Sequence, residues 1–315
     1  MEDKEFTKSE GNKQKRPRIK RDYVAANPDD PRQHRTEKVA RPRPKKKAKP
    51  RRLKGSEEII QHKINRRRNR QAPPEPKYDG TTRLNKYISN AGICSRRDAD
   101  KLIEAGAVSV NGQVITTLGF KVKEGDVVSY GGEVLRSEPK RYFLLNKPKG
   151  YITTLDDPQE RNTVMLLMQG CCKERIYPVG RLDKNTTGLL LFTNDGEMAK
   201  RLTHPSSNVY KIYMVECDRP VSHSDMQQMI DGIELEDGPI AVDDVQYQGD
   251  GKDHRVVGVA LHSGRNRIVR RIFEHFGYEV RKLDRTVFAG LTKKDLPRGR
   301  YRELSQQEVN YLMMV

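Results

Sequence analysis

The stretch "GRLDKNTTGLLLFTNDGE" occupies residues 180–197 and leads from a small polar loop into four consecutive apolar residues. Asp183 stands in the loop, just before the segment that the apolar run predicts to be a buried strand. A carboxylate at the edge of a buried strand costs free energy unless a cation or hydrogen-bond donors pair with it. The sequence therefore predicts a partner for Asp183 elsewhere in the chain.

A second segment, "SGRNRIVRRIFEHFGY" at residues 263–278, is the candidate source of that partner. Its pattern predicts a helix with one apolar face, made of Ile268, Val269, Ile272, Phe273 and Phe276. On such a helix Arg267 lies opposite the apolar face, and Arg270 lies on its border. A border arginine can aim its guanidinium into a cleft, so Arg270 is the expected partner of Asp183. The alternative is a local contact with Glu274, and spacing alone does not choose between the two.

The distribution of charge divides the chain. It has 315 residues, enough for about two domains, and its 61 Lys and Arg against 43 Asp and Glu give a formal net charge of +18. Most of this excess falls in residues 1–80, which include "RPRPKKKAKPRR" and "NRRRNR" and few apolar residues. This composition predicts a disordered basic tail. The tail serves either as a solubilising segment or as an arm attracted to polyanions such as RNA.

Several function classes are not supported by the sequence. No apolar run approaches the roughly 18–20 residues that span a bilayer, and the first residues lack the apolar stretch of a signal peptide. The four cysteines contain no Cys-x-x-Cys pair, which argues against a disulfide framework or a zinc site. We therefore expect a reduced, cytoplasmic protein with no metal and no membrane association.

Residues 81–136 are predicted to form a small separate module. One helix is expected within "TRLNKYISNAG", and a second within "RRDADKLIEAG", where Ser95 can cap the helix and Asp98 follows in a capping-box position. Asn111-Gly112 between alternating residues is a strong hairpin signal. The exposed basic side chains of the two helices are Arg83, Lys86, Arg96, Arg97 and Lys101.

This order of elements resembles the RNA-binding domain named after small-subunit ribosomal protein four, along "RLNKYISNAGICSRRDADKLIEAGAVSVNG". The resemblance implies that the five basic side chains contact RNA. Phosphate contacts of this kind position a protein on RNA without specifying a sequence. The alternative is an ordinary helical hairpin with solvated charges.

Residues 140–315 are predicted to form a larger α+β domain. Strands outnumber helices and lack the regular alternation of a doubly wound fold. We therefore expect a mixed, mainly antiparallel sheet with flanking helices. Asp195 in "NDGE" is expected to cap a helix, and the alternative is a glycosidase-like pair of carboxylates with Asp183.

Three segments together carry a more specific resemblance: "GRLDKNTTGLLLFTNDGE", "KIYMVE" at residues 211–216, and "SGRNRIVRRIFEHFGYEVRKLDR" at residues 263–285. They are similar to the pseudouridine synthase family typified by the ribosomal small-subunit synthase A and large-subunit synthase B. The resemblance extends from Thr81 to the C-terminus. It implies a pseudouridine synthase fold, with the catalytic aspartate at Asp183, the active-site tyrosine at Tyr213 and the active-site arginine at Arg270. One departure is Ile268, where many members have Gln.

The family's reaction isomerises a uridine within RNA, and it requires a carboxylate near C1′ that is ionised at neutral pH. An arginine partner favours that ionised form, which would explain the position of Asp183. The base must first leave the RNA stack, and Tyr213 could hold it. The resemblance implies no cofactor. It also implies that Arg181, Arg265 and Arg267 contact RNA.

The expected partner is ribosomal RNA or a ribosomal-subunit precursor, bound by a monomer, with large-subunit RNA as the preferred substrate. Two alternatives remain: the same isomerase acting on small-subunit RNA, and a non-catalytic RNA-binding factor for ribosome assembly. The presence of Asp183, Tyr213 and Arg270 together favours the enzyme. The sequence does not identify the uridine, and it does not distinguish a covalent ester on Asp183 from a glycal route.

Overall fold

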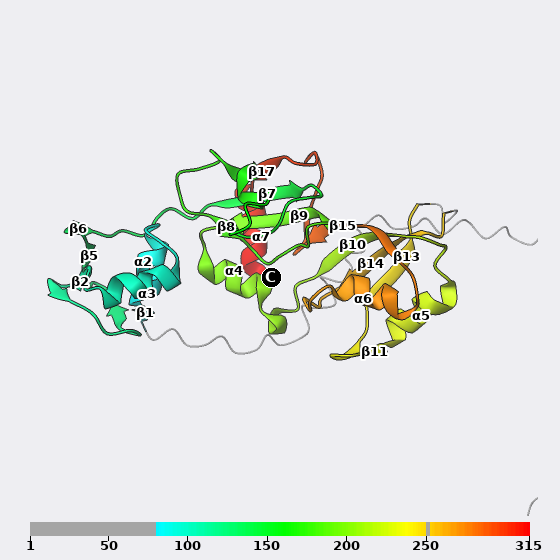
Figure 1. Ribbon diagram of the computed structural model, residues 1–315, viewed down its shortest axis with the longest axis horizontal. Helices are drawn as coiled ribbons and strands as arrows, with labels where there is room; N and C mark the ends of the chain where they lie inside the picture. Colours follow the sequence, from blue (N-terminus) through cyan, green and yellow to red (C-terminus); the bar gives the residue numbers. More distant parts are fainter. Residues whose placement is uncertain (1–79, 250–252) are drawn as a thin grey trace, which may run out of the picture. The chain divides into compact units, whose positions relative to one another are not determined.

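The computed structural model describes residues 80–249 and 253–315 (Figure 1). The predicted disordered tail lies outside the described residues, apart from Gly80. The first module consists of β1 (Thr81–Arg83), α2 (Leu84–Asn90), α3 (Arg96–Glu104), β2 (Val108–Val110), β3 (Gln113–Val114), β4 (Lys121–Lys123), β5 (Val128–Tyr130) and β6 (Glu133–Val134). Strands β3, β2, β5 and β6 form one antiparallel sheet, and β1 pairs with β4.

The local signals in this module are confirmed. The Ser95 side chain accepts a hydrogen bond from the backbone N–H of Asp98 and caps α3. Asn111 and Gly112 join β2 to β3 with φ values of 52° and 81°, the left-handed conformation that a type I′ hairpin requires. The apolar faces of both helices pack on the small sheet, in a core that includes Leu84, Ile88, Ala99, Ile103, Val108 and Val128.

The larger domain is built on one nine-stranded sheet. Its strands are β7 (Tyr142–Lys147), β8 (Tyr177–Pro178), β9 (Thr187–Thr193), β10 (Lys211–Cys217), β13 (Asp244–Tyr247), β14 (Val256–Leu261), β15 (Val280–Phe288), β16 (Leu291–Thr292) and β17 (Tyr301–Glu303). The main order is β13-β14-β10-β15-β9-β7-β17, and β11 (Ile233–Leu235) and β12 (Gly238–Ile240) form a separate hairpin. Of the pairings among the described strands, only β15 with β9 is parallel. The predicted mixed, mainly antiparallel sheet is therefore confirmed.

The central strand β15 brings distant segments together. It lies between β10 and β9, which follow each other closely in sequence but do not pair. Arg285 of β15 is in register with Tyr213 of β10 on one side and with Gly188 of β9 on the other. The loop that contains Asp183 enters β9, so this arrangement places the two predicted catalytic segments on either side of β15.

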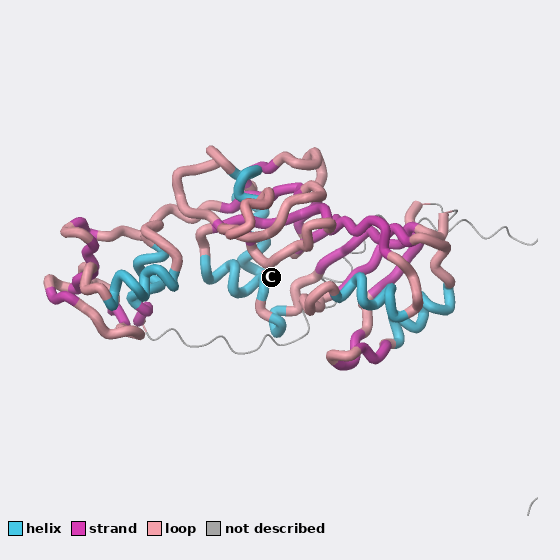
Figure 2. Tube along the Cα trace, in the orientation of Figure 1, coloured by secondary structure: helices cyan, strands magenta, loops and turns pink. Residues whose placement is uncertain are grey.

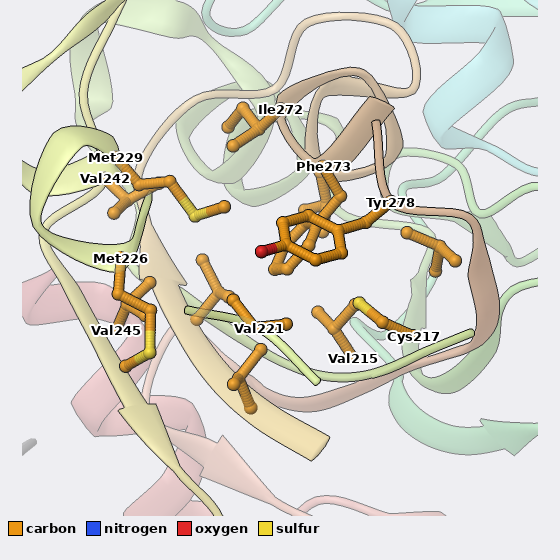
Figure 3. Close-up of a cluster of buried hydrophobic side chains, with 14 of the residues drawn as sticks. Val215, Cys217, Val221, Met226, Met229, Val242, Val245, Ile272, Phe273 and Tyr278 are labelled. Atoms are coloured by element: carbon orange, nitrogen blue, oxygen red, sulfur yellow. The ribbon is translucent and has the colours of Figure 1, made fainter. Parts of the chain in front are cut away.

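Helices cover both halves of the sheet (Figures 1 and 2). Helices α5 (His223–Asp231) and α6 (Ile268–His275) pack on β10, β13 and β14, where Met226, Met229, Ile272 and Phe273 meet Val215, Val245 and Val259. Figure 3 shows most of this cluster, with Phe273 and Tyr278 close to each other. Helices α4 (Gly196–Thr203) and α7 (Gln306–Met314) pack on β7 and β9 through Met198, Leu202, Val309 and Leu312. The 3₁₀ helices η1 (Val164–Met168) and η2 (Pro205–Ser207) complete the domain.

The predicted elements differ from the structure in two places near the site. The sequence "RYFLLNKPKGYITT" at residues 141–154 predicts two strands joined at Pro148, and the structure reduces the second to a single bridge between Ile152 and Thr163. Helix α6 begins only at Ile268, so residues 263–267 approach it in a non-helical conformation. The second difference changes where Arg267 points. None of the helices in the described ranges is long and apolar enough to cross a membrane.

Candidate active site

The loop around Asp183 is held by a buried lysine at the end of β7. Lys147 is fully buried, and its Nζ lies 3.1 Å from the carbonyl oxygen of Asp183 and 2.9 Å from that of Thr186. The carbonyl oxygens of Pro148 and Lys184 lie at 3.2 and 3.4 Å. An ammonium group surrounded by carbonyl dipoles fixes the path of a loop that has no regular secondary structure of its own.

The burial of Lys147 also affects its protonation. Removal from water disfavours the charged form, which lowers the pKa of Lys147 to about 8, while the nearby Asp183 carboxylate acts in the opposite direction. Lys147 was not among the predicted site residues. The signal was present in "NKPKG", because a lysine at the end of an apolar strand needs buried partners.

Two further contacts fix the same loop. The hydroxyl of Thr153 donates to the carbonyl of Leu182 at 2.9 Å and accepts from its backbone N–H at 3.2 Å. The backbone N–H of Gly150 donates to the carbonyl of Lys184 at 2.8 Å. The backbone of the loop is therefore bound on both sides of Asp183, while the Asp183 side chain keeps 39% of its surface exposed.

Among the described residues, Arg267 is the cation nearest to the Asp183 carboxylate. Its Nη1 lies 3.9 Å from Oδ2 of Asp183, and 46% of the Arg267 side chain is exposed. Arg267 is the N-cap residue of α6, with φ of 47° and ψ of 27°. The helical geometry that would turn it away from the site does not apply to a residue in this left-handed conformation. This corrects the expectation that Arg267 lies opposite the buried face of a helix.

Arg270 does not form the predicted ion pair with Asp183 among the described residues. Its Nη1 donates to the carbonyl oxygen of Val280 at 2.9 Å, because the border of α6 faces the start of β15. Burial is the main cause that lowers the pKa of Arg270, followed by the charge of Arg267, while Asp183 and Glu274 raise it. Arg270 therefore lies within electrostatic range of Asp183 without touching it. The predicted contact with Glu274 is not formed either; Glu274 lies 3.4 Å from Nη2 of Arg267.

A cavity of about 600 Å³ opens beside these residues. Asp183 is the only acidic side chain in the described part of its lining, and it stands among five lysine and arginine side chains: Arg181, Lys211, Arg265, Arg267 and Arg285. Tyr213 also lines the cavity and packs against both neighbouring hydrophobic clusters. The structure therefore brings Asp183 and Tyr213 to one cavity and leaves Arg270 outside its lining. The positive charge of these side chains would attract a polyanion to the cavity, toward the exposed Asp183 carboxylate.

The other predicted RNA contacts lie in two places. Arg83, Arg96, Arg97 and Lys101 are exposed on the first module, and Lys86 is partly buried there. Lys101 pairs with Asp98 at 3.0 Å. In the larger domain Arg181 is exposed, whereas Arg265 donates to the carbonyl oxygens of Gly238 and Pro239, each at 2.9 Å. Arg265 thus supports the β11–β12 hairpin at the edge of the cavity.

Two remaining sequence interpretations concern chemistry next to the site. Asp195 accepts hydrogen bonds from the backbone N–H groups of Glu197 and Met198 and from the hydroxyl of Tyr142. Through the two backbone hydrogen bonds, the buried Asp195 side chain caps α4, as predicted. In the part of the chain that the structure describes, no group of three or more His, Cys, Asp or Glu side chains could hold a metal ion.

Comparison with known proteins identifies both parts of the chain. Residues 82–128 match the S4 domain, and residues 141–275 match the family described as RNA pseudouridylate synthase. An uncharacterized RNA pseudouridine synthase of Aquifex aeolicus is 41% identical over 73% of this chain and 93% of its own length. The ribosomal large subunit pseudouridine synthase B of Bacillus subtilis is 40% identical over 73% and 95%.

Two further matches are also pseudouridine synthases. The dual-specificity RNA pseudouridine synthase RluF of Escherichia coli K12 is 36% identical over 73% of this chain and 78% of its own. A solved structure described as a pseudouridylate synthase has a TM-score of 0.54 and 29% identity, and the match covers 73% of this chain and 99% of that one. The chain therefore belongs to the RNA pseudouridine synthases of the small-subunit synthase A and large-subunit synthase B type, isomerases that carry an S4 RNA-binding domain.

Proposed function

We propose that this enzyme converts one specific uridine of ribosomal RNA, in the large subunit, to pseudouridine in the cytoplasm of a bacterial cell. The observation that carries the proposal is the Asp183 carboxylate, which stands among five lysine and arginine side chains in the described cavity lining, with Tyr213 beside it. The Bacillus subtilis relative is named for the large ribosomal subunit, which favours that RNA over the small-subunit RNA.

Asp183, Tyr213 and Arg270 are proposed as the catalytic residues. The N1–C1′ bond of the flipped uridine breaks, and its electron pair stays on the uracil. The Asp183 carboxylate stabilises the electron-poor C1′ or bonds to it. The uracil turns, its C5 forms the new bond to C1′, and the proton on C5 leaves while N1 gains one. Tyr213 packs against the base, and its hydroxyl assists the proton transfers.

The exposed basic residues and Arg270 have different proposed roles. Exposed Arg181 and Arg267 contact the phosphates on each side of the flipped nucleotide, and the basic side chains of the S4 domain hold the flanking RNA. Arg270 acts on Asp183 through its charge from outside the cavity lining. The arrangement needs no redox step and no phosphoryl transfer.

The decisive experiment compares ribosomal RNA from a strain lacking the gene with RNA from its parent. Chemical labelling that is specific for pseudouridine should reveal one missing modification in large-subunit RNA. Re-expression of the gene should restore it, and re-expression with Asp183→Asn should not. A missing site in small-subunit RNA would correct the substrate, and an unchanged pattern would contradict the proposal.

A second RNA substrate is the alternative with a specific observation behind it. The Escherichia coli relative RluF is named a dual-specificity enzyme. The same labelling, applied to total RNA, distinguishes one missing modification from two.

A further inference from the structure

A buried arginine lies at the centre of the sheet, beneath the candidate active site. Arg285 is 3% exposed and lines the cavity that Asp183 and Tyr213 also line. It is in register with Tyr213 on β10 and with Gly188 on β9. Residues directly opposite each other on paired strands project to the same side of a sheet. Arg285 therefore lies next to the residue that holds the base.

The guanidinium of Arg285 is only partly bonded. Its Nε donates to the carbonyl oxygen of Leu189 at 2.8 Å, and its Cζ lies 4.5 Å from the ring centroid of Phe288. Its Nη2 is buried and has no hydrogen-bond partner. Among the described residues, no carboxylate forms an ion pair with Arg285. The neighbouring Asp284 is bound to Lys293 and Arg298 instead.

The close packing of the two strands keeps Arg285 in this position. Gly188 has φ of +107°, and a Cβ at this residue would lie 2.3 Å from the carbonyl oxygen of Arg285 and 2.5 Å from its nitrogen. The glycine therefore allows β9 and β15 to approach, directly after the Asp183 loop. A buried, unpaired N–H of a charged group is costly. Such a group is explained if its acceptor arrives with a ligand.

The chemistry of the cavity indicates which ligand atom that is. Phosphate oxygens are strongly hydrated and suit the exposed Arg181 and Arg267 at the cavity surface. A uracil ring, by contrast, leaves water when it flips in, and it has only carbonyl oxygens to offer as strong acceptors. A buried guanidinium beside Tyr213 suits that ring and not the backbone.

We propose that Arg285 is a further substrate-contacting residue, whose Nη2 donates to a carbonyl oxygen of the flipped uracil; this rests on the proposed function. The guanidinium pivots about its bond to Leu189 to reach the oxygen. When the N1–C1′ bond breaks, the electron pair left on N1 is delocalised onto the O2 and O4 oxygens. The Arg285 cation stabilises this anion and retains the detached base until C5 bonds to C1′ and the C5 proton leaves.

The test combines variants with substrate analogues in single-turnover reactions. The probes are synthetic stem-loop RNAs with uridine, 2-thiouridine or 4-thiouridine at the position found by the labelling experiment. Sulfur is a poorer acceptor than oxygen, so we expect one of the two thio substitutions to slow the wild-type enzyme about three- to tenfold. Arg285→Gln and Arg285→Lys should be at least about tenfold slower on uridine and should lose most of that thio effect.

The loss of the thio effect separates contact with the base from a structural role. A variant that merely disturbs the sheet would slow all three RNAs equally and keep the wild-type ratio, and this result would overturn the proposal. No thio effect in the wild-type enzyme would also overturn it, even if neither variant folds. Arg281→Gln, on an exposed position of the same strand, should leave rates and ratios unchanged. A wild-type enzyme inactive on uridine would instead contradict the proposed function.

Discussion

The two segments that meet at the cavity are fixed in very different ways. The Asp183 loop is bound through its backbone by buried Lys147 and by Thr153. The segment that presents Arg267 has no side-chain cap, and its contact with Asp183 spans 3.9 Å between two exposed groups. The carboxylate is thus held in place by the fold, while the Arg267 side chain beside it is bound only through exposed contacts.

The difference agrees with the energies of the two kinds of contact. An exposed ion pair contributes about 0–1 kcal/mol and is weakened by salt. Hydrogen bonds from a buried cation to backbone carbonyls contribute about 1.5–3 kcal/mol each when both groups are satisfied. A reaction that needs a carboxylate close to one ribose carbon depends on the second kind of contact, because small displacements of a reacting group are costly to rate.

The largest expected effect comes from substituting Asp183, in the loop that Lys147 and Thr153 hold in place. Asp183→Asn keeps the shape of the side chain but removes its charge, so isomerisation should fall by more than about a hundredfold. RNA affinity should stay within a few-fold, because Asp183 is not one of the groups that attract phosphate. Single-turnover assays and binding titrations measure the two quantities, with exposed Asp156→Asn as control. A variant that keeps more than about a hundredth of the rate would move the catalytic role to another residue.

Removing the support of the loop should have the next largest effect. Lys147→Met preserves length and apolar packing but leaves several carbonyl oxygens without a donor, so the rate should fall about 10- to 100-fold through misplacement of Asp183. RNA affinity should change little. Equal rates for the variant and the wild type would show that the loop keeps its path without the lysine.

The same variant gives a test by pH. The pKa of Lys147 is lowered from 10.5 to about 8 in the folded protein, so between these values the unfolded chain binds more protons. Stability should therefore rise with pH across this window, by up to about 3 kcal/mol from this group. Below pH 8 the group contributes no slope. Denaturant unfolding of wild type and Lys147→Met at several pH values should give a difference with this sign.

Substitutions of Arg267 and Arg270 should differ in their effect on the free energy of unfolding. Arg270→Ala leaves the carbonyl of Val280 without its donor and should cost about 1–3 kcal/mol of unfolding free energy, together with most of the turnover. Arg267→Ala should leave stability within about 0.5 kcal/mol and weaken RNA binding more than turnover. Thermal melts, titrations and single-turnover rates compare the two. A stable and fully active Arg270→Ala enzyme would transfer the supporting role to Arg267.

The smallest effect on turnover is expected from deleting residues 1–80. These residues carry most of the net positive charge of the chain but none of the proposed catalytic groups. RNA binding should weaken, and the dependence of log K on log salt should become less steep, because fewer counterions are released. The rate of bound substrate should hardly change. An unchanged salt dependence would make the segment a solubiliser only, and a large loss of rate would assign it a part in the site.

Local patterns predicted well those elements whose ends carry their own signals. Ser95 begins α3 where a hydroxyl can cap it, and the periodicity of the helix then places its residues as expected. Helix α6 has no such cap, and its apolar period gave no sign that Arg267 adopts a left-handed conformation. The helical period therefore extends one residue too far in the prediction, which places Arg267 on the side away from Asp183.

Long-range support of the site could not be predicted in the same way. Lys147 contacts a loop more than thirty residues away, and Arg285 reaches β9 from a strand near the end of the chain. Neither contact follows from a periodic pattern in the sequence around Lys147 or Arg285. The proposal that Asp183 and Tyr213 are catalytic came from recognisable motifs, whereas the groups beneath them depend on strand order, which no single segment encodes.

The place of β15 in the sheet also affects the order in which the enzyme can be made. On a ribosome, β9 and β10 emerge about ninety and about seventy residues before β15, the strand that must separate and join them. Strand β9 follows Asp183, and strand β10 contains Tyr213. Until β15 has been synthesised, these two strands lack the neighbour that joins them in the sheet. A product terminated before Val280 would therefore contain both residues and still lack a site. Messages cut short in this region should yield RNA-binding fragments that modify nothing.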